Sequence, residues 1–284
     1  SAASDVYKRQ VWSRALEGAS DYVRVRDGVV WASSSVYEIE ISDYTESTVW
    51  MFDSSGSLQQ RWTFSERAWH LDLHNDGGVL LGLGRPRCGY LRIRRGEDAE
   101  HHDLTSGSPV TIGACGSDGR FLIGHSDGSV SVLSESGEVP GEVKSTQVRA
   151  ICSSEQNWFS GHHSGEVVSS RGWVVSAPGA VQSLAFGPGA SEGNGIWTPR
   201  WGDGVSRVAV LDAADGSTAL ELGHPHRIRH IQSAGEIVAL GDSEGRIHLI
   251  EKEVLSRRLG TDGDSEDDER RGQLMARLRQ LREA

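Results

Sequence analysis

The sequence predicts an all-β protein built from repeats of about 40 residues, and three observations carry this prediction. Glycines that are predicted to lie in turns follow short apolar runs at Gly82, Gly124, Gly161, Gly202 and Gly241, with separations of 42, 37, 41 and 39 residues. After such a glycine come a few polar residues, a second glycine and an alternating strand. The 35 Gly and 9 Trp suit tight turns and large packing residues. A period of this length made only of short strands is typical of a β-propeller with four-stranded blades.

Six blades are visible in the repeat pattern. Their predicted spans are 20–65, 66–106, 107–145, 146–178, 179–224 and 225–260. Residues 11–16 are predicted to be an orphan outer strand of a preceding blade, so we expect seven blades in the intact protein. A closed ring of six blades is the alternative. If a blade is absent, the sheets on either side should expose apolar faces.

The repeats resemble those of WD40-repeat β-propellers over residues 11–260. Residues 181–189 resemble the inner strand and following turn of such a repeat. Residues 49–53 and 208–212 resemble its third strand, which in that family usually ends in Trp-Asp. The dipeptide Trp-Asp occurs nowhere in this chain, and no repeat carries the full Gly-His to Trp-Asp signature. The resemblance therefore implies a propeller and leaves related propellers, including quinoprotein-like ones, open.

The two ends differ from the repeats. Residues 1–10 resemble a translated library-adapter fragment and are predicted to be non-native. Residues 261–269 contain six carboxylates and are predicted to be a solvated acidic linker. Residues 270–284 are predicted to form an amphipathic helix, which docks on a partner, pairs with a copy of itself or folds back. Its apolar face carries Leu274, Leu278 and Leu281.

Charge and composition exclude several classes of protein. The 29 basic and 40 acidic residues give a net charge of −11, which argues against a general nucleic-acid binder. No stretch approaches the roughly 18 apolar residues of a membrane helix. Three cysteines are too few for a disulfide framework. We expect a monomeric propeller in the cytoplasm that has no cofactor.

Motifs that suggest chemistry have structural explanations. Residues 124–128 and 241–245 match Gly-x-Ser-x-Gly, the nucleophile elbow of hydrolases. Because a true elbow occurs once, between a strand and a helix, Ser126 and Ser243 are predicted to be turn residues. Trp31, Trp158 and Trp197 recur in second strands, which favours packing between sheets.

Metal-binding patterns are weak in the sequence. Histidines 101–102, 162–163 and 224 with 226 form close pairs, but neighbours on a strand point to opposite faces. Cys88, Cys115 and Cys152 lack paired spacing and are predicted to pack. The sequence therefore predicts no catalytic, cofactor or metal site.

Polar residues at the entrances to the inner strands are the candidate binding site. The predicted partner-binding residues are Arg24, His70, Arg149, Gln182, Arg227 and Arg229. Arginine pairs with carboxylates in a two-point fashion, so a ring of arginines would bind a protein partner. An extended hairpin at 36–41 and a glycine-rich insertion at 187–195 are either recognition loops or neutral length variation.

The predicted function is a non-catalytic WD40-like scaffold that binds a protein partner through one face and its loops. The alternative is a propeller enzyme, quinoprotein-like or a hydrolase, with its site over the central channel. A sensor or assembly domain of a larger chain is a third possibility and is compatible with the first.

Overall fold

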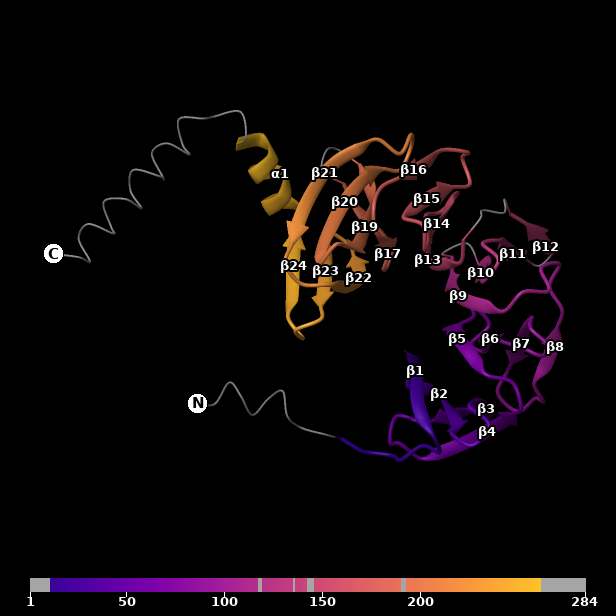
Figure 1. Ribbon diagram of the computed structural model, residues 1–284. Helices are drawn as coiled ribbons and strands as arrows, with labels where there is room; N and C mark the ends of the chain where they lie inside the picture. The colour runs from indigo at the N-terminus through magenta and orange to yellow at the C-terminus, as the bar shows by residue number, and fades with distance from the viewer. Residues whose placement is uncertain (1–10, 117–118, 135, 142–145, 190–192, 262–284) are drawn as a thin grey trace.

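A computed structural model of the chain describes residues 11–116, 119–134, 136–141, 146–189 and 193–261. These residues form 24 strands and one helix. The strands make six antiparallel sheets that follow one another along an arc (Figure 1). The predicted all-β propeller of six visible blades is confirmed.

The first three sheets each contain four strands in sequence order. The first contains β1 (Ala19–Arg26), β2 (Val29–Glu38), β3 (Asp43–Phe52) and β4 (Leu58–Phe64). The second contains β5 (Ala68–Leu73), β6 (Val79–Leu83), β7 (Tyr90–Ile93) and β8 (Glu100–His102). The third contains β9 (Val110–Cys115), β10 (Phe121–His125), β11 (Val130–Ser134) and β12 (Gly137–Pro140).

The fourth sheet follows the same plan, whereas the fifth and sixth depart from it. The fourth contains β13 (Val148–Ser153), β14 (Trp158–His162), β15 (Glu166–Ser169) and β16 (Val174–Ser176). The fifth splits its inner strand into β17 (Ala180–Val181) and β18 (Ala185–Pro188), which both pair with β19 (Asn194–Gly202), followed by β20 (Val205–Asp212) and β21 (Thr218–His224). The sixth has only β22 (Ile228–Ala234), β23 (Ile237–Asp242) and β24 (Ile247–Glu251).

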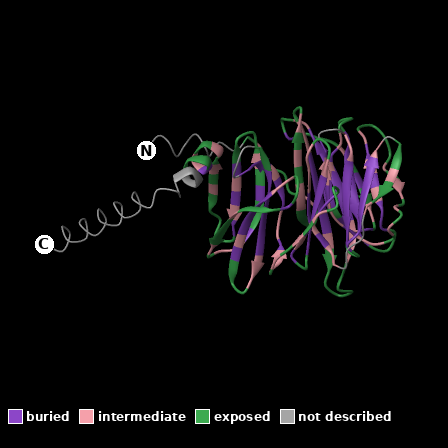
Figure 2. Cartoon of the chain, turned by 90° about the horizontal axis from the view of Figure 1, so that it is seen from above, coloured by how far each residue is buried: buried purple, intermediate pink, exposed green. Residues whose placement is uncertain are grey.

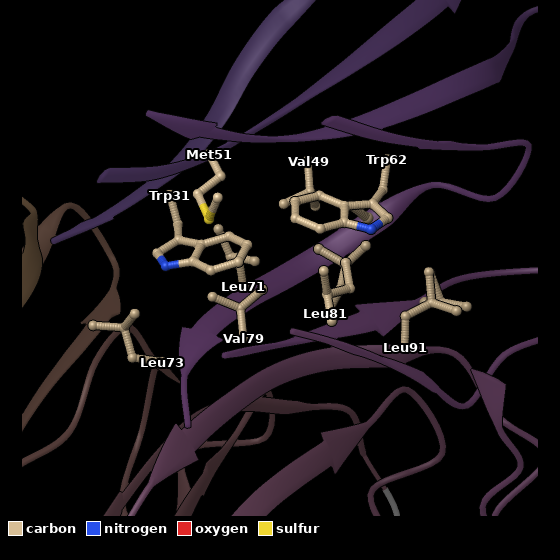
Figure 3. Close-up of a cluster of buried hydrophobic side chains, with 12 residues drawn as sticks. Trp31, Val49, Met51, Trp62, Leu71, Leu73, Val79, Leu81 and Leu91 are labelled. Carbon is tan, nitrogen blue, oxygen red and sulfur yellow. The ribbon is translucent and has the colours of Figure 1, made fainter. Parts of the chain in front are cut away.

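Apolar side chains from facing sheets form the core between blades. Figure 3 shows Trp31, Val49, Met51 and Trp62 of the first sheet packed against leucines and Val79 of the second. The rings of Trp31 and Trp62 stack with centroids 5.6 Å apart. Burying each large apolar side chain contributes about 1.5–3 kcal/mol. Trp158 and Trp197 are buried as well, so the predicted packing role of the three tryptophans is confirmed.

The first glycine of each hairpin pattern has a different role from the predicted one. Gly82, Gly124 and Gly161 lie within strands and do not form turns. A Cβ added to them would lie 2.4 Å from a Cγ1 atom of the next inner strand, in Val110, Val148 and Val181 respectively. These glycines therefore let consecutive blades approach closely. The turn conformation belongs to the second glycine, as at Gly128 with φ 90°.

Gly202 was grouped with these glycines by its spacing, and the structure separates it. Val181 pairs with Arg200, as Val148 pairs with His162 in the fourth sheet. Pro199 therefore occupies the position of Gly161, and Gly202 lies three residues further along, at the end of β19.

The arc of sheets does not close into a six-bladed ring, because the first and sixth sheets are not side by side (Figure 1). The predicted orphan strand at 11–16 is wrong, since these residues form no strand. Trp12 instead packs on Phe52 and donates from Nε1 to the carbonyl of Ser54 at 3.1 Å. Leu16 joins the apolar cluster around Trp50. The segment lies against the first sheet because Trp12 and Leu16 are half-buried there.

Apolar side chains are exposed on the sheets that flank the opening, as predicted for such a gap. On β1, Tyr22 and Arg24 contact the second sheet, whereas Val25 on the alternate face is 60% exposed. On β24, Ile250 packs with the fifth sheet, whereas Ile247 is 74% exposed. Figure 2 shows exposed and buried positions alternating along the strands near the helix.

Helix α1 (Lys252–Thr261) follows β24 where the other blades continue into a fourth strand. Leu255 of this helix is buried in the cluster that contains Trp197. Residues 252–260, which were predicted to belong to the propeller, lie in this helix. Two predicted segments fall outside the described residues. They are the acidic linker at 261–269, apart from its first residue, and the helix at 270–284 with Leu274, Leu278 and Leu281. Within the described part of the chain, no helix is long and apolar enough to cross a membrane.

Candidate functional site

One face of the arc collects the connections that lead into the inner strands. The turns between second and third strands hydrogen-bond to these connections in four blades. Ser126 donates its N–H to the carbonyl of Pro109 at 2.9 Å, and Ser243 donates its N–H to the carbonyl of Arg227 at 2.8 Å. Both serines therefore lie in turns between antiparallel strands, as predicted. We call this side of the molecule the entrance face.

The inner strands share a bulge near the entrance face. Their pairing with the second strand skips one residue at the same point in five sheets. The skipped residues are Asp21, Trp69, Thr111, Arg149 and Arg229. In the fifth sheet the strand breaks after β17, which places Gln182 there. We call these six residues the entrance ring. A bulge leaves its residue out of the ladder and re-aims the side chain.

Four of the six predicted partner-binding residues lie on the entrance face. Arg149, Gln182 and Arg229 belong to the entrance ring. Arg227 lies on the connection into β22, and its Nε donates to Oε1 of Gln182 at 2.7 Å. Their role in binding a partner stays a prediction.

Arg24 does not lie at the entrance of its strand. It pairs with Trp31, three residues beyond the bulge at Asp21 and close to the turn on the opposite face. Its Nε donates to Oδ1 of Asp72 in the second sheet at 3.1 Å. The alternating sequence of β1 carries no mark of the bulge position, so sequence alone assigned the wrong register.

His70 lies directly after a bulge and is too buried to meet a partner. Only 3% of the residue is exposed, and its ring packs edge-on against Tyr22 at a centroid distance of 5.4 Å. Burial lowers the pKa of His70, although Asp72, 3.8 Å away, opposes this shift. The residue that reaches the surface is its neighbour Trp69.

Sequence reasoning missed an aromatic group around Arg67. The guanidinium carbon of Arg67 lies 3.7 Å from the ring centroids of both Tyr44 and Trp69. Such cation–π contacts hold the three side chains together. The repeat alignment could have identified Trp69, because this residue holds the same place in its repeat as Arg149 and Arg229.

The predicted extended hairpin rises beside this group. Strands β2 and β3 are ten residues each, and the turn between them is a second-to-third-strand turn on the entrance face. Ile39 and Ile41 at its tip are 82% and 60% exposed. Tyr37 packs against Tyr44 with a centroid distance of 5.0 Å. We call Tyr37, Ile39, Ile41, Tyr44, Arg67 and Trp69 the aromatic patch.

The other predicted insertion, at 187–195, joins β18 to β19. A turn between the first and second strands lies on the face opposite the entrance face. The described ends of the insertion, residues 187–189 and 193–195, therefore lie away from the aromatic patch.

A cavity of about 930 Å³ lies between the second and third sheets. Arg92 and Arg94 line it, and both donate to Oδ2 of Asp76. Despite partial burial, these guanidinium groups hold the pKa of Asp76 well below its usual range. Asp76 thus neutralises part of the positive charge of the cavity wall.

Comparison with known proteins supports the fold. No protein-family model matches the chain, and no curated protein sequence matches it. A catalytically inactive virginiamycin B lyase from Staphylococcus aureus, solved with quinupristin, is similar in structure with a TM-score of 0.57. Its identity is 12%, over 81% of this chain and 94% of that chain.

Two further structures show the same kind of likeness. The selenomethionine form of the Staphylococcus aureus lyase gives a TM-score of 0.56 at 12% identity, over 82% of this chain and 94% of that chain. The computationally designed Ika8 protein gives 0.49 at 14% identity, over 83% of this chain and 98% of that chain. At these identities the lyase structures are similar to this chain in fold alone, and they assign it no activity. Membership of the WD40 family stays a prediction.

Proposed function

We propose that this protein is a non-catalytic interaction scaffold that binds a protein partner on its entrance face. The observation that carries the proposal is the aromatic patch, which exposes aliphatic and aromatic side chains beside arginine on one face. Tryptophan, tyrosine and arginine are the residue types that dominate binding energy at protein interfaces. A surface of this composition suits a protein partner with an apolar segment.

Charge complements the apolar contacts. The entrance ring carries Arg149 and Arg229, and Arg227 lies next to it. Rim charges of one sign steer a partner of the opposite sign and set specificity more than affinity. We therefore infer that the partner presents acidic side chains next to its apolar segment.

The enzyme alternative has less support. His70 is buried away from the entrance face, and Ser126 and Ser243 are held in turns by their backbone. An enzyme with its site over the channel would need acid–base groups that a substrate can reach from this face.

Affinity capture with the full chain tests the proposal. The variants Trp69→Ala and Arg149→Glu with Arg229→Glu should each bind the captured partner at least tenfold more weakly, while their melting temperatures stay near that of the parent. Arg171→Glu, at an exposed position on the opposite face, is the matched control and should keep full affinity. Equal affinity of all variants, or an equal loss in the control, would contradict the assignment of this face.

A further inference from the structure

Three potential metal ligands converge at the junction of the fifth and sixth sheets. His224 ends β21, Asp242 ends β23, and His248 is the second residue of β24. One ligand atom from each residue lies within 4.8 Å of the other two. Oδ2 of Asp242 lies 3.3 Å from Nε2 of His248 and 4.0 Å from Nε2 of His224.

The surrounding backbone orients these ligands. Nδ1 of His224 lies 2.9 Å from the carbonyl oxygen of His226 and 3.2 Å from the backbone nitrogen of His226. In one of the two neutral tautomers Nδ1 carries the proton and donates it to that carbonyl. That tautomer leaves the lone pair of Nε2 directed to Asp242. A hydrogen bond from the second ring nitrogen to a carbonyl is typical of metal-binding histidines.

Backbone groups also orient the carboxylate of Asp242. Its Oδ1 accepts the N–H groups of Glu244 and Arg246, both at 2.9 Å, which leaves Oδ2 for the histidines. The side chain has no exposed area. A buried carboxylate requires compensating charge, which a metal ion supplies.

Two other blades fill the position of Asp242 with a histidine. His125 and His162 correspond to Asp242, because each pairs with the residue before the bulge. His125 uses both ring nitrogens, toward Ser108 O at 3.2 Å and Ser131 Oγ at 2.9 Å. His162 does the same with Thr146 O at 2.8 Å and Ser160 Oγ at 3.0 Å. Those blades close the position with hydrogen bonds, whereas the sixth blade places a carboxylate between two imidazoles.

We propose that His224, Asp242 and His248 bind a transition-metal ion, with Zn²⁺ the best match. Two imidazoles and one carboxylate form a common zinc ligand set, completed by water in the fourth position. Tetrahedral ligands about 2.1 Å from zinc lie roughly 3.4 Å apart, which the Asp242–His248 pair already meets. His224 needs to approach Asp242 by about 0.6 Å and His248 by about 1.4 Å.

Sequence analysis predicted no metal site because the ligands come from three strands and match no spacing motif. The bound ion would join the outer strand of the fifth sheet to the second and third strands of the sixth. It would thereby fasten the last sheet of the arc, which has only three strands.

The full chain, stripped with EDTA and titrated with Zn²⁺ in a calorimeter, tests this site. We expect one tight site per chain that weakens at least about 100-fold in His224→Ala and in His248→Ala, a larger loss than for residues that only orient ligands. His163→Ala removes an exposed histidine from the corresponding turn of the fourth sheet and should bind as the parent does. Saturating Zn²⁺ should raise the melting temperature of the parent by roughly 5 °C or more and that of His224→Ala by much less.

Two further readouts separate metal binding from a purely structural role. Asp242→Asn keeps the shape of the side chain and should still lose the site, and Co²⁺ in the parent should give a visible spectrum of tetrahedral type. Absence of a tight site, or an equal loss in His163→Ala, would overturn the proposal. Partner capture through Trp69 is measured separately, so failure of either proposal leaves the other intact.

Discussion

Gly124 offers a direct test of how consecutive blades pack. An alanine Cβ at this position would lie 2.4 Å from Cγ1 and 2.7 Å from Cβ of Val148, and 2.9 Å from Cγ2 of Ile112. Carbon atoms in contact prefer about 3.5–4.0 Å, so β10 and the next inner strand, β13, would have to move apart. Overpacking of this kind costs about 1–3 kcal/mol. For a domain of this size the melting temperature of Gly124→Ala should fall by about 2–12 °C.

Gly241 provides the matched control, because it holds the same position in the sixth sheet. The nearest atom to an added Cβ is Cβ of His230, at 3.9 Å. Gly241→Ala should therefore leave the melting temperature unchanged or raise it slightly, since alanine restricts the unfolded chain. Differential scanning calorimetry of both variants decides the matter. An equal fall in both would refute the reasoning, because it would mean that the glycines are needed for the strand itself and not for the neighbouring blade.

Two other predictions concern single side chains. Asp127 accepts hydrogen bonds from the hydroxyls of Ser129 and Ser106 and from the N–H of Ser129, which together outweigh partial burial and lower its pKa to about 2. Its contribution to stability is full above about pH 4 and is lost as the pH falls through about 2, so Asp127→Ala should cost about 1 kcal/mol at pH 7 after solvent screening. Denaturant titrations should show that the difference in the free energy of unfolding between the parent and Asp127→Ala shrinks toward pH 3. A difference that stays constant with pH would contradict this prediction. Burial raises the pKa of the Cys152 thiol to about 12, so in mass spectrometry iodoacetamide at pH 8 should label Cys152 only after unfolding. Labelling of the folded protein at the rate of a free thiol would show that the thiol is not shielded.

The repeat was predictable because its signals are local. Alternating strands, paired glycines and a period near 40 residues are written within each unit, so the number of visible blades and the packing of the tryptophans follow from the sequence. The same pattern showed that the two Gly-x-Ser-x-Gly motifs are turns. Their recurrence at equivalent places is a property that a single catalytic serine does not have.

The candidate site was only partly predictable, since a bulge has no fixed sequence mark. Arg149 and Arg229 were found because each follows the first apolar residue of a recognisable inner strand. Arg24 was wrongly expected at the entrance of its strand. Shifting by one residue exchanges a buried side chain for an exposed one, and for this reason His70 was chosen in place of Trp69.

The sequence by itself determined the class of the fold, the blade pattern and the residues that fill the spaces between sheets, because hydrophobic periodicity acts within each strand. Tertiary structure alone decided which residues meet across strands. It brought Arg67 between Tyr44 and Trp69, gathered His224, Asp242 and His248 from three strands, and placed α1 where a fourth strand was expected. These contacts depend on strand register and on the packing of one blade against the next, and neither is encoded in the spacing along the chain.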